Sequence, residues 1–121
     1  MAITTNIFNF EHDRGDTLIH EIRVKNTDGT AKDLTGTTEI RYRIAKNSSD
    51  HTVVLSKTLT GGGVAITDAL QGVLQGTFPA AEVAATLTAK QYVYDCEVAF
   101  GAVEHTVQKG RITLIGDVPQ P

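Results

Sequence analysis

Tyr92-Val93-Tyr94-Asp95-Cys96-Glu97-Val98-Ala99-Phe100 is the stretch of sequence that decides the fold. Apolar or aromatic side chains occupy every second position of it, and Asp95 and Glu97 lie between them. This period of two is typical of a β-strand with one face against a core and the other face in water. A second alternating run, residues 103–109, follows after Gly101-Ala102, so the two runs predict a β-hairpin. The pair places the chain in the β class and favours a packed structural module over an enzyme.

Strand patterns also fill the first half of the chain, where turn-forming residues separate them. Phe8 and Phe10 share one face of the first pattern, and the third has the clearest alternation of this half. The fourth has the weakest alternation, which predicts a strand at the edge of a sheet. In order, these patterns cover residues 7–10, 17–25, 38–45 and 52–60.

The second half adds a hairpin and one helix candidate. Residues 64–67 and 72–78 flank the short connection Asp68-Ala69-Leu70-Gln71 and predict the hairpin. Pro79 and the alanines after it predict one short helical turn near residues 80–87, with Val83 and Leu87 spaced to dock on a sheet. A last strand, residues 111–115, follows Gly110. About seven to eight short strands with this spacing predict a two-sheet antiparallel sandwich.

The length and composition suit one domain without disulfide bridges. The chain has 121 residues, so we expect a single β-sandwich domain over residues 1–121, with residues 1–12 as an arm or first strand and 117–121 as an exit tail. Cys96 is the only cysteine and has no partner for an intrachain bridge.

The charge and hydropathy patterns argue against several partners. The formal net charge is -3, and no basic stripe follows the chain, so we expect no nucleic-acid partner. No apolar run reaches the length of a signal peptide or a membrane helix, so we expect no membrane partner and a soluble chain.

The residues that most often carry chemistry show no specific spacing. A catalytic or metal site would start from four histidines and three carboxylates, but no H-x-x-x-H or C-x-x-C pattern is present. We therefore predict no catalytic, cofactor-binding or metal-binding residues, no cofactor and no small-molecule substrate. The residues weighed for this purpose are His12, His20, His51, His105, Asp13, Asp16 and Glu21.

Four further motifs have structural explanations. Cys96 falls on the apolar face of its strand, where a buried thiol is a poor nucleophile. Gly61-Gly62-Gly63 lacks the lysine and hydroxyl residue of a phosphate loop and precedes a strand, so we expect a flexible turn. Arg14-Gly15-Asp16 spells a cell-adhesion tripeptide, and Asn47-Ser48-Ser49 fits the glycosylation sequon. We interpret the first as a turn between strands and the second as a loop.

Several segments, in their order and spacing, resemble the immunoglobulin-like N-terminal domain of phage baseplate upper proteins and related structural proteins of tailed-phage virions. These segments are residues 14–17, 28–30, 33–36, 72–74, 84–87, 92–98 and 110–118. The resemblance implies an immunoglobulin-like sandwich that works by assembly, and the family offers no catalytic residues to transfer.

The resemblance leads to a leading hypothesis and two alternatives. The leading hypothesis is a structural virion protein of a tail, baseplate, collar or capsid surface, located in the virion, whose partners are other virion proteins and copies of itself. One alternative is a carbohydrate-binding sandwich for host-surface adhesion, which needs an exposed tyrosine among Tyr42, Tyr92 and Tyr94. The other is a small hydrolase or cupin-like enzyme, which needs His12, His20 and His105 to converge.

Overall fold

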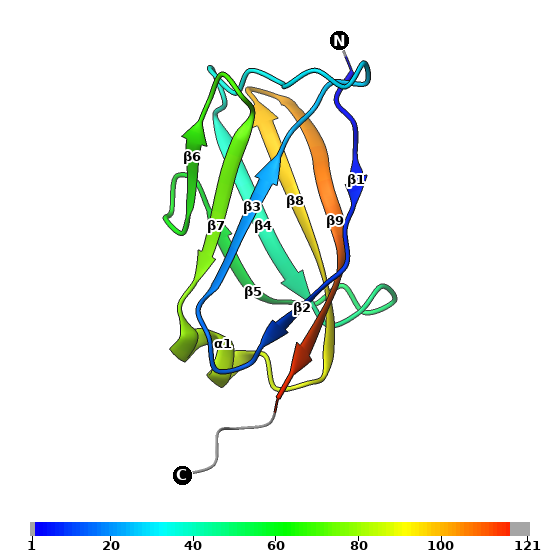
Figure 1. Ribbon diagram of the computed structural model, residues 1–121, viewed down its shortest axis with the longest axis vertical. Coiled ribbons are helices and arrows are strands. Elements are labelled where there is room, and N and C mark those ends of the chain that lie inside the picture. Colours follow the sequence, from blue (N-terminus) through cyan, green and yellow to red (C-terminus); the bar gives the residue numbers. More distant parts are fainter. Residues whose placement is uncertain (1, 117–121) are drawn as a thin grey trace.

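Two β-sheets pack face to face in the computed structural model, which describes residues 2–116 (Figure 1). The larger sheet has the strand order β1-β9-β8-β4-β5, with β2 also paired to β9, and the smaller sheet has the order β3-β7-β6. The strands are β1 (Asn6–Ile7), β2 (Phe10–Asp13), β3 (Leu18–Arg23), β4 (Glu39–Ala45), β5 (Val53–Thr58), β6 (Val64–Asp68), β7 (Val73–Phe78), β8 (Gln91–Phe100) and β9 (Val103–Ile115).

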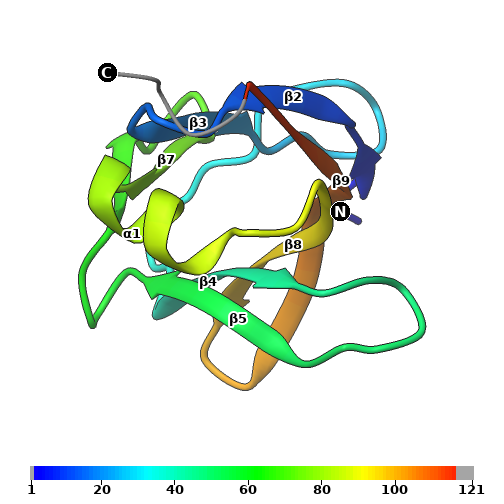
Figure 2. The ribbon, with the colours of Figure 1, turned by 90° about the horizontal axis from the view of Figure 1, so that it is seen from below.

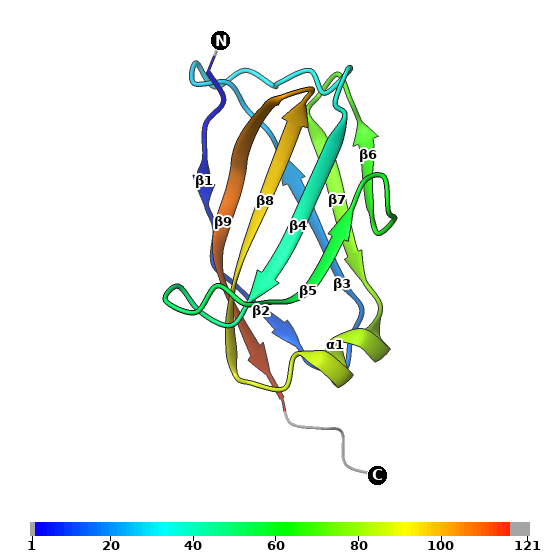
Figure 3. The same cartoon turned by 180° about the vertical axis from the view of Figure 1, so that it is seen from behind.

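This strand order is that of an immunoglobulin-like sandwich. The chain changes layer after β2, β3, β5 and β7, and the strands β4, β8 and β9 form the centre of the larger sheet (Figure 3). All pairs among β3 to β9 are antiparallel, whereas β1 and β2 run parallel to β9. The predicted all-β sandwich is therefore confirmed, with nine strands in the described part of the chain instead of seven to eight.

The alternation along β8 sets the core, as the sequence predicts. Tyr92, Tyr94, Cys96 and Val98 are each at most 5 % exposed, and β8 pairs with β4 on one side and β9 on the other. Tyr42 of β4 is fully buried and stacks on Tyr94, with ring centroids 5.4 Å apart. Each such side chain contributes about 1.5–3 kcal/mol through burial of apolar surface. One hydrophobic cluster fills the space between the sheets.

The predicted helical turn is α1 (Ala80–Thr86), which lies across one end of the sandwich (Figure 2). Val83 and Leu87 are fully buried, so the i, i+4 pair docks on the core as expected. Pro79 occupies the position before the helix, and its carbonyl accepts hydrogen bonds from Glu82 and Val83 N–H. An ion pair of 2.9 Å between Lys57 Nζ and Glu82 Oε1 joins the helix to β5. The sheet order also confirms that β5 is an edge strand.

The start of the chain differs from the prediction. Residues 7–10 do not form one strand, because β1 ends at Ile7 and β2 begins at Phe10. Between them the Tyr94 hydroxyl donates to Phe8 O, and Arg111 N–H donates to Asn9 Oδ1. Phe8 and Phe10 still share a side and stack at 5.8 Å. Both short strands follow the edge of β9, so residues 6–7 and 10–13 are strands, whereas residue 1 and the exit tail, 117–121, lie outside the described residues.

The end of the described chain also differs, because residues 103–115 form one strand. Gly110 does not separate two strands; it lies within β9, opposite Tyr94. The register between β8 and β9 shifts between Cys96 and Glu97, and this bulge turns both Val107 and Gln108 inward. The strict alternation predicted for residues 103–109 therefore fails at the bulge.

Candidate functional site

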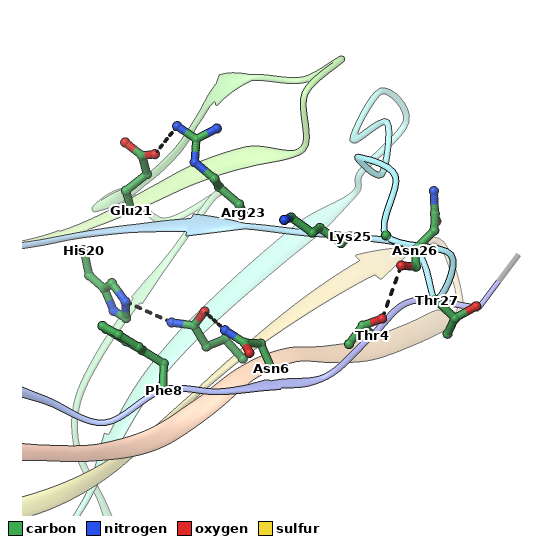
Figure 4. A pocket seen from close by; sticks show the side chains of 11 residues that line it. Thr4, Asn6, Phe8, His20, Glu21, Arg23, Lys25, Asn26 and Thr27 are labelled. Atoms are coloured by element: carbon green, nitrogen blue, oxygen red, sulfur yellow. Dashed lines mark hydrogen bonds and ion pairs between the residues drawn. The ribbon is translucent and has the colours of Figure 1, made fainter.

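A groove of about 460 Å³ lies along β3, on the side that faces the first residues of the chain (Figure 4). Its two walls are β3 with the turn after it and the segment that includes β1, and Thr4 closes one end by bonding Lys25 O (2.9 Å). The residues that line the groove are Thr4, Asn6, Phe8, His20, Glu21, Arg23, Lys25, Asn26, Thr27, Gly29 and Gln108.

The β3 wall of the groove is a free strand edge. Val24 N–H donates to Gly72 O on the β7 side (2.8 Å), whereas Lys25 O accepts from Thr4 on the opposite side. Because successive residues of an antiparallel strand direct their backbone groups to alternate edges, those of Ile19, Glu21 and Arg23 face away from β7. The smaller sheet ends at β3, so no described strand pairs with these groups. An edge of this kind can accept an added strand.

Charged side chains stand above this edge. Arg23 forms a 2.8 Å ion pair with Glu21, and both side chains are at least half exposed on the outer face of β3. Figure 4 shows the two side chains pointing away from the opposite wall, whereas His20 points toward Phe8. Lys25, next in this row, forms no ion pair within the described residues. The mixed charges suit a polar protein surface.

The floor of the groove is a buried network of polar side chains. His20 Nδ1 lies 2.7 Å from the Tyr42 hydroxyl, and His20 Nε2 lies 2.9 Å from Gln108 Nε2. Gln108 Nε2 also donates to the Tyr94 hydroxyl at 3.0 Å, and Gln108 Oε1 accepts from Asn6 Nδ2 at 3.2 Å. His20 is 7 % exposed and Gln108 is 4 % exposed. The network thus connects the four strands β3, β4, β8 and β9 with the segment that carries β1.

Burial shifts the pKa values of this network in the directions that favour the uncharged forms of its side chains. Desolvation lowers the pKa of His20 to about 4, so the imidazole is neutral near pH 7. Desolvation also raises the pKa of Tyr94 to about 12 and that of Tyr42 well above its usual value. The floor is therefore uncharged at neutral pH, and its hydroxyl and amide groups fix the first residues of the chain by hydrogen bonds.

A second, wider hollow of about 860 Å³ lies on the outer face of the larger sheet, beneath the loop of residues 46–52. Arg43 at its floor bonds both oxygens of Asp95, at 3.0 and 3.2 Å, and also Glu97. Hydrogen bonding to Asp95 raises the pKa of Arg43. Since these two carboxylates satisfy the guanidinium, it is poorly placed to bind an anionic ligand.

The histidines weighed as metal or catalytic residues do not come together. His12 Nε2 bonds Asp16 O (2.9 Å), His51 Nε2 contacts Ser48 O in an exposed loop, and His20 lies in the core. Within residues 2–116, no three His, Cys, Asp or Glu side chains are grouped as metal ligands. His20 and Glu21 lie on opposite faces of β3, as the sequence indicates.

Cys96 and the tyrosines belong to the core. The Cys96 side chain is fully buried, and desolvation raises the pKa of its thiol to about 12, which keeps the thiol protonated. Tyr42, Tyr92 and Tyr94 are at most 5 % exposed. None of these three rings is therefore available to stack on a sugar, as the carbohydrate-binding alternative needs.

The short motifs are turns and loops. Arg14 of the adhesion-like tripeptide donates to Ala89 O (2.9 Å), which fixes its side chain against the neighbouring loop. Asn47 of the sequon accepts from Ser49 N–H (3.0 Å) and so closes its own loop. In the triple glycine, Gly62 adopts a φ of 105° and its N–H donates to Thr58 O, so it belongs to a turn.

Two comparisons with known proteins were informative only by what they did not find. The chain matches no protein-family model, and no curated protein matches it. The described residues contain no helix with the length and hydropathy required to span a membrane.

Sequence reasoning missed the groove and its floor. Gln108 is inward in phase with Ile112 and Leu114, but the bulge at Val107 breaks the alternation predicted for residues 103–109 and hides this phase. Asn6 and Phe8 reach the floor because β1 runs along β9. The one signal in the sequence is the apolar face of residues 18–24, where His20 stands between Leu18 and Ile22. A histidine in that position needs polar partners inside the core.

Proposed function

We propose that this chain is a non-enzymatic structural protein of a tailed-phage virion, where it works by association with other virion proteins and with copies of itself. The observation that carries the proposal is the free edge of β3 beside a groove, because assembly by strand addition requires unpaired backbone groups and room for a strand. The resemblance of the sequence to virion domains supports the same class of function and suggests the particle as its location.

Exposed apolar side chains near the groove support an assembly role. Ile19, on β3 itself, is 59 % exposed, Phe8 on the opposite wall is 46 % exposed, and Ile7 next to it is 68 % exposed. An incoming strand that bonds the β3 edge would cover part of this apolar surface. Backbone hydrogen bonds would then supply affinity, and the side chains around the groove would supply selectivity.

A pair of substitutions at Glu21 tests the strand-addition surface. Glu21→Pro removes an N–H that faces the groove and leaves the β7 ladder intact, whereas Glu21→Ala keeps that N–H; both remove the ion pair with Arg23. We expect the proline variant to lose association at micromolar concentration and the alanine variant to keep it. Sedimentation of the purified chain, alone and with particle components, measures this association.

Two results would oppose the proposal. Association that survives Glu21→Pro unchanged would show that the β3 edge is not the surface used. If the unmodified chain neither self-associates nor binds any particle component, the assembly role itself loses its support. The genomic neighbourhood tests the virion assignment separately: a reading frame among head, tail or fibre genes supports it, and a metabolic operon overturns it.

A further inference from the structure

The hydrogen bonds of the floor determine where the protons of the network lie. Phe8 O can only accept, so the Tyr94 hydroxyl donates its single hydrogen to Phe8 O, at 2.7 Å. The group 3.0 Å from Tyr94 must therefore be a donor, which identifies it as the amide nitrogen of Gln108. The same nitrogen lies 2.9 Å from His20 Nε2. His20 Nε2 is consequently an acceptor, and the imidazole is neutral with its hydrogen on Nδ1.

A second proton on His20 has no acceptor in this arrangement. An Nε2–H group would face the Gln108 amide, which also donates. Rotation of the Gln108 amide by a half-turn would provide an oxygen for His20 but would place the amide nitrogen against Asn6 Nδ2, its present donor. The rotation would also remove the donor that Tyr94 accepts from. With Asn6 in its present orientation, accommodating the proton therefore breaks the bond that connects the floor with Asn6 or disturbs the one that holds Phe8.

Among residues 2–116, no charged group near the ring compensates for the proton. β4 contributes Tyr42 and β8 contributes Tyr94, both phenols whose pKa values burial raises, and Cys96 nearby on β8 is a protonated thiol. Opposite His20 on β7 is Gly76. The residues before β3 contribute the rings of Phe8 and Phe10, and β9 contributes the neutral Gln108, while Glu21 and Arg23 point to the outer face of β3.

The N-terminal segment, defined as residues 2–9, is held mainly by individual hydrogen bonds. Backbone bonds to the body run from Thr4 to Lys25, from Thr27 to Ala2 and from Phe8 to Lys109, and β1 pairs only two residues with β9. Side-chain bonds join Thr4 with Asn26, Thr5 with Thr106 and Asn9 with Arg111. Ile3 packs partly against the core, whereas Ile7 is largely exposed and Phe8 is about half exposed. The bonds to Gln108 and Tyr94 are the ones that connect this segment with the buried floor.

We propose that protonation of His20 releases the N-terminal segment from the sandwich, so that mild acid uncovers the edge of β9 and widens the groove beside β3 while the core strands stay paired. This release depends on one proton at His20 and on the amide side chain of Gln108. It concerns the isolated chain and does not depend on the virion assignment.

Amide hydrogen exchange by NMR tests the proposal, with rates expressed as protection factors so that the intrinsic pH dependence cancels. Thr4 and Phe8 report on the segment because both N–H groups bond the body, and the amides of β4 and β8 report on the core. We expect the opening constant at Thr4 and Phe8 to rise by up to about tenfold per pH unit below about pH 6.5, and the core amides to keep their protection. The His20 ring resonances should titrate within the pH range over which the opening constant rises.

Two variants and the unmodified chain make the test decisive. His20→Gln should give segment protection that does not change with pH, because its side chain does not titrate, whereas His51→Gln in the exposed loop should behave like the unmodified chain. The proposal is overturned by constant protection in the unmodified chain, by simultaneous loss in segment and core, or by pH dependence that survives His20→Gln. If His20→Gln does not fold, the unmodified chain decides alone, since titration of the His20 ring outside the pH range in which the segment protection changes also overturns the proposal.

Discussion

The strand β8 and the N-terminal segment lie in the same sheet but are held in opposite ways. β8 pairs on both sides, and its inward side chains from Tyr92 to Val98 are at most 5 % exposed. The segment pairs with β9 through two residues of β1 and with Asn26 through a single bridge at Ile3, and it leaves Ile7 68 % exposed. Burial holds the first, whereas individual polar bonds hold the second. One sheet therefore contains a strand stabilised by packing and a segment attached by single hydrogen bonds. Substitutions should change the stability of the core in the first and the attachment of the segment in the second.

Tyr42→Ala should have the largest effect, because it empties the centre of the packed region. Tyr42 is fully buried, stacks on Tyr94 and bonds His20. We expect a loss of about 3–5 kcal/mol in the free energy of unfolding, from lost burial and the cavity left behind. Urea unfolding followed by circular dichroism measures the loss. A change of less than about 1 kcal/mol would contradict the central place given to this ring.

Gly110→Ala should act on the segment more than on the core. A Cβ at Gly110 would overlap the Phe8 carbonyl and lie 2.9 Å from Asn9 Oδ1, so the segment must move. We expect a loss of about 1–3 kcal/mol through overpacking, with amide shifts concentrated in residues 5–9. The control is Gly101→Ala, which strains a turn at φ 65° but meets no atom within 4 Å. Equal amide shifts in residues 5–9 for both variants would contradict the prediction.

Phe8→Ala should cost less than either change, although Phe8 contacts both Phe10 and His20. Its ring is 46 % exposed, so truncation returns only part of a buried aromatic surface to water. We expect a loss of about 1 kcal/mol in the free energy of unfolding, measured by the same urea titration. A loss as large as that of Tyr42→Ala would remove the distinction between the two regions.

The ion pair between Lys57 and Glu82 should contribute least. Its two side chains are 21 % and 39 % exposed, so solvent screens the 2.9 Å contact between β5 and α1. A double-mutant cycle with Lys57→Ala and Glu82→Ala should give a coupling of about 0.2–1 kcal/mol that decreases with added salt. A coupling that does not depend on salt would indicate that α1 is attached differently from this structure.

The sequence predicts what alternation encodes and misses what depends on contacts between distant residues. Strands β3, β4 and β8, the β6–β7 hairpin and α1 follow from local periodicity, because each has one buried face. The bulge at Gln108 and the parallel pairing of β1 with β9 have no local signal. Both hide the groove from sequence reasoning, since its floor has Gln108 inward and its wall has β1 at the edge of β9. His20 could be placed in the core from sequence, but its partners could not.

The bonds that fix the N-terminal segment also constrain the order of folding. Thr5 bonds Thr106, Asn6 bonds Gln108, and Phe8 bonds Tyr94, so the earliest residues of the chain find their partners about a hundred positions later. Contacts that close such long loops form slowly, because the chain must first lose much of its freedom. During synthesis, residues 5–8 therefore reach their place only after β9 has left the ribosome.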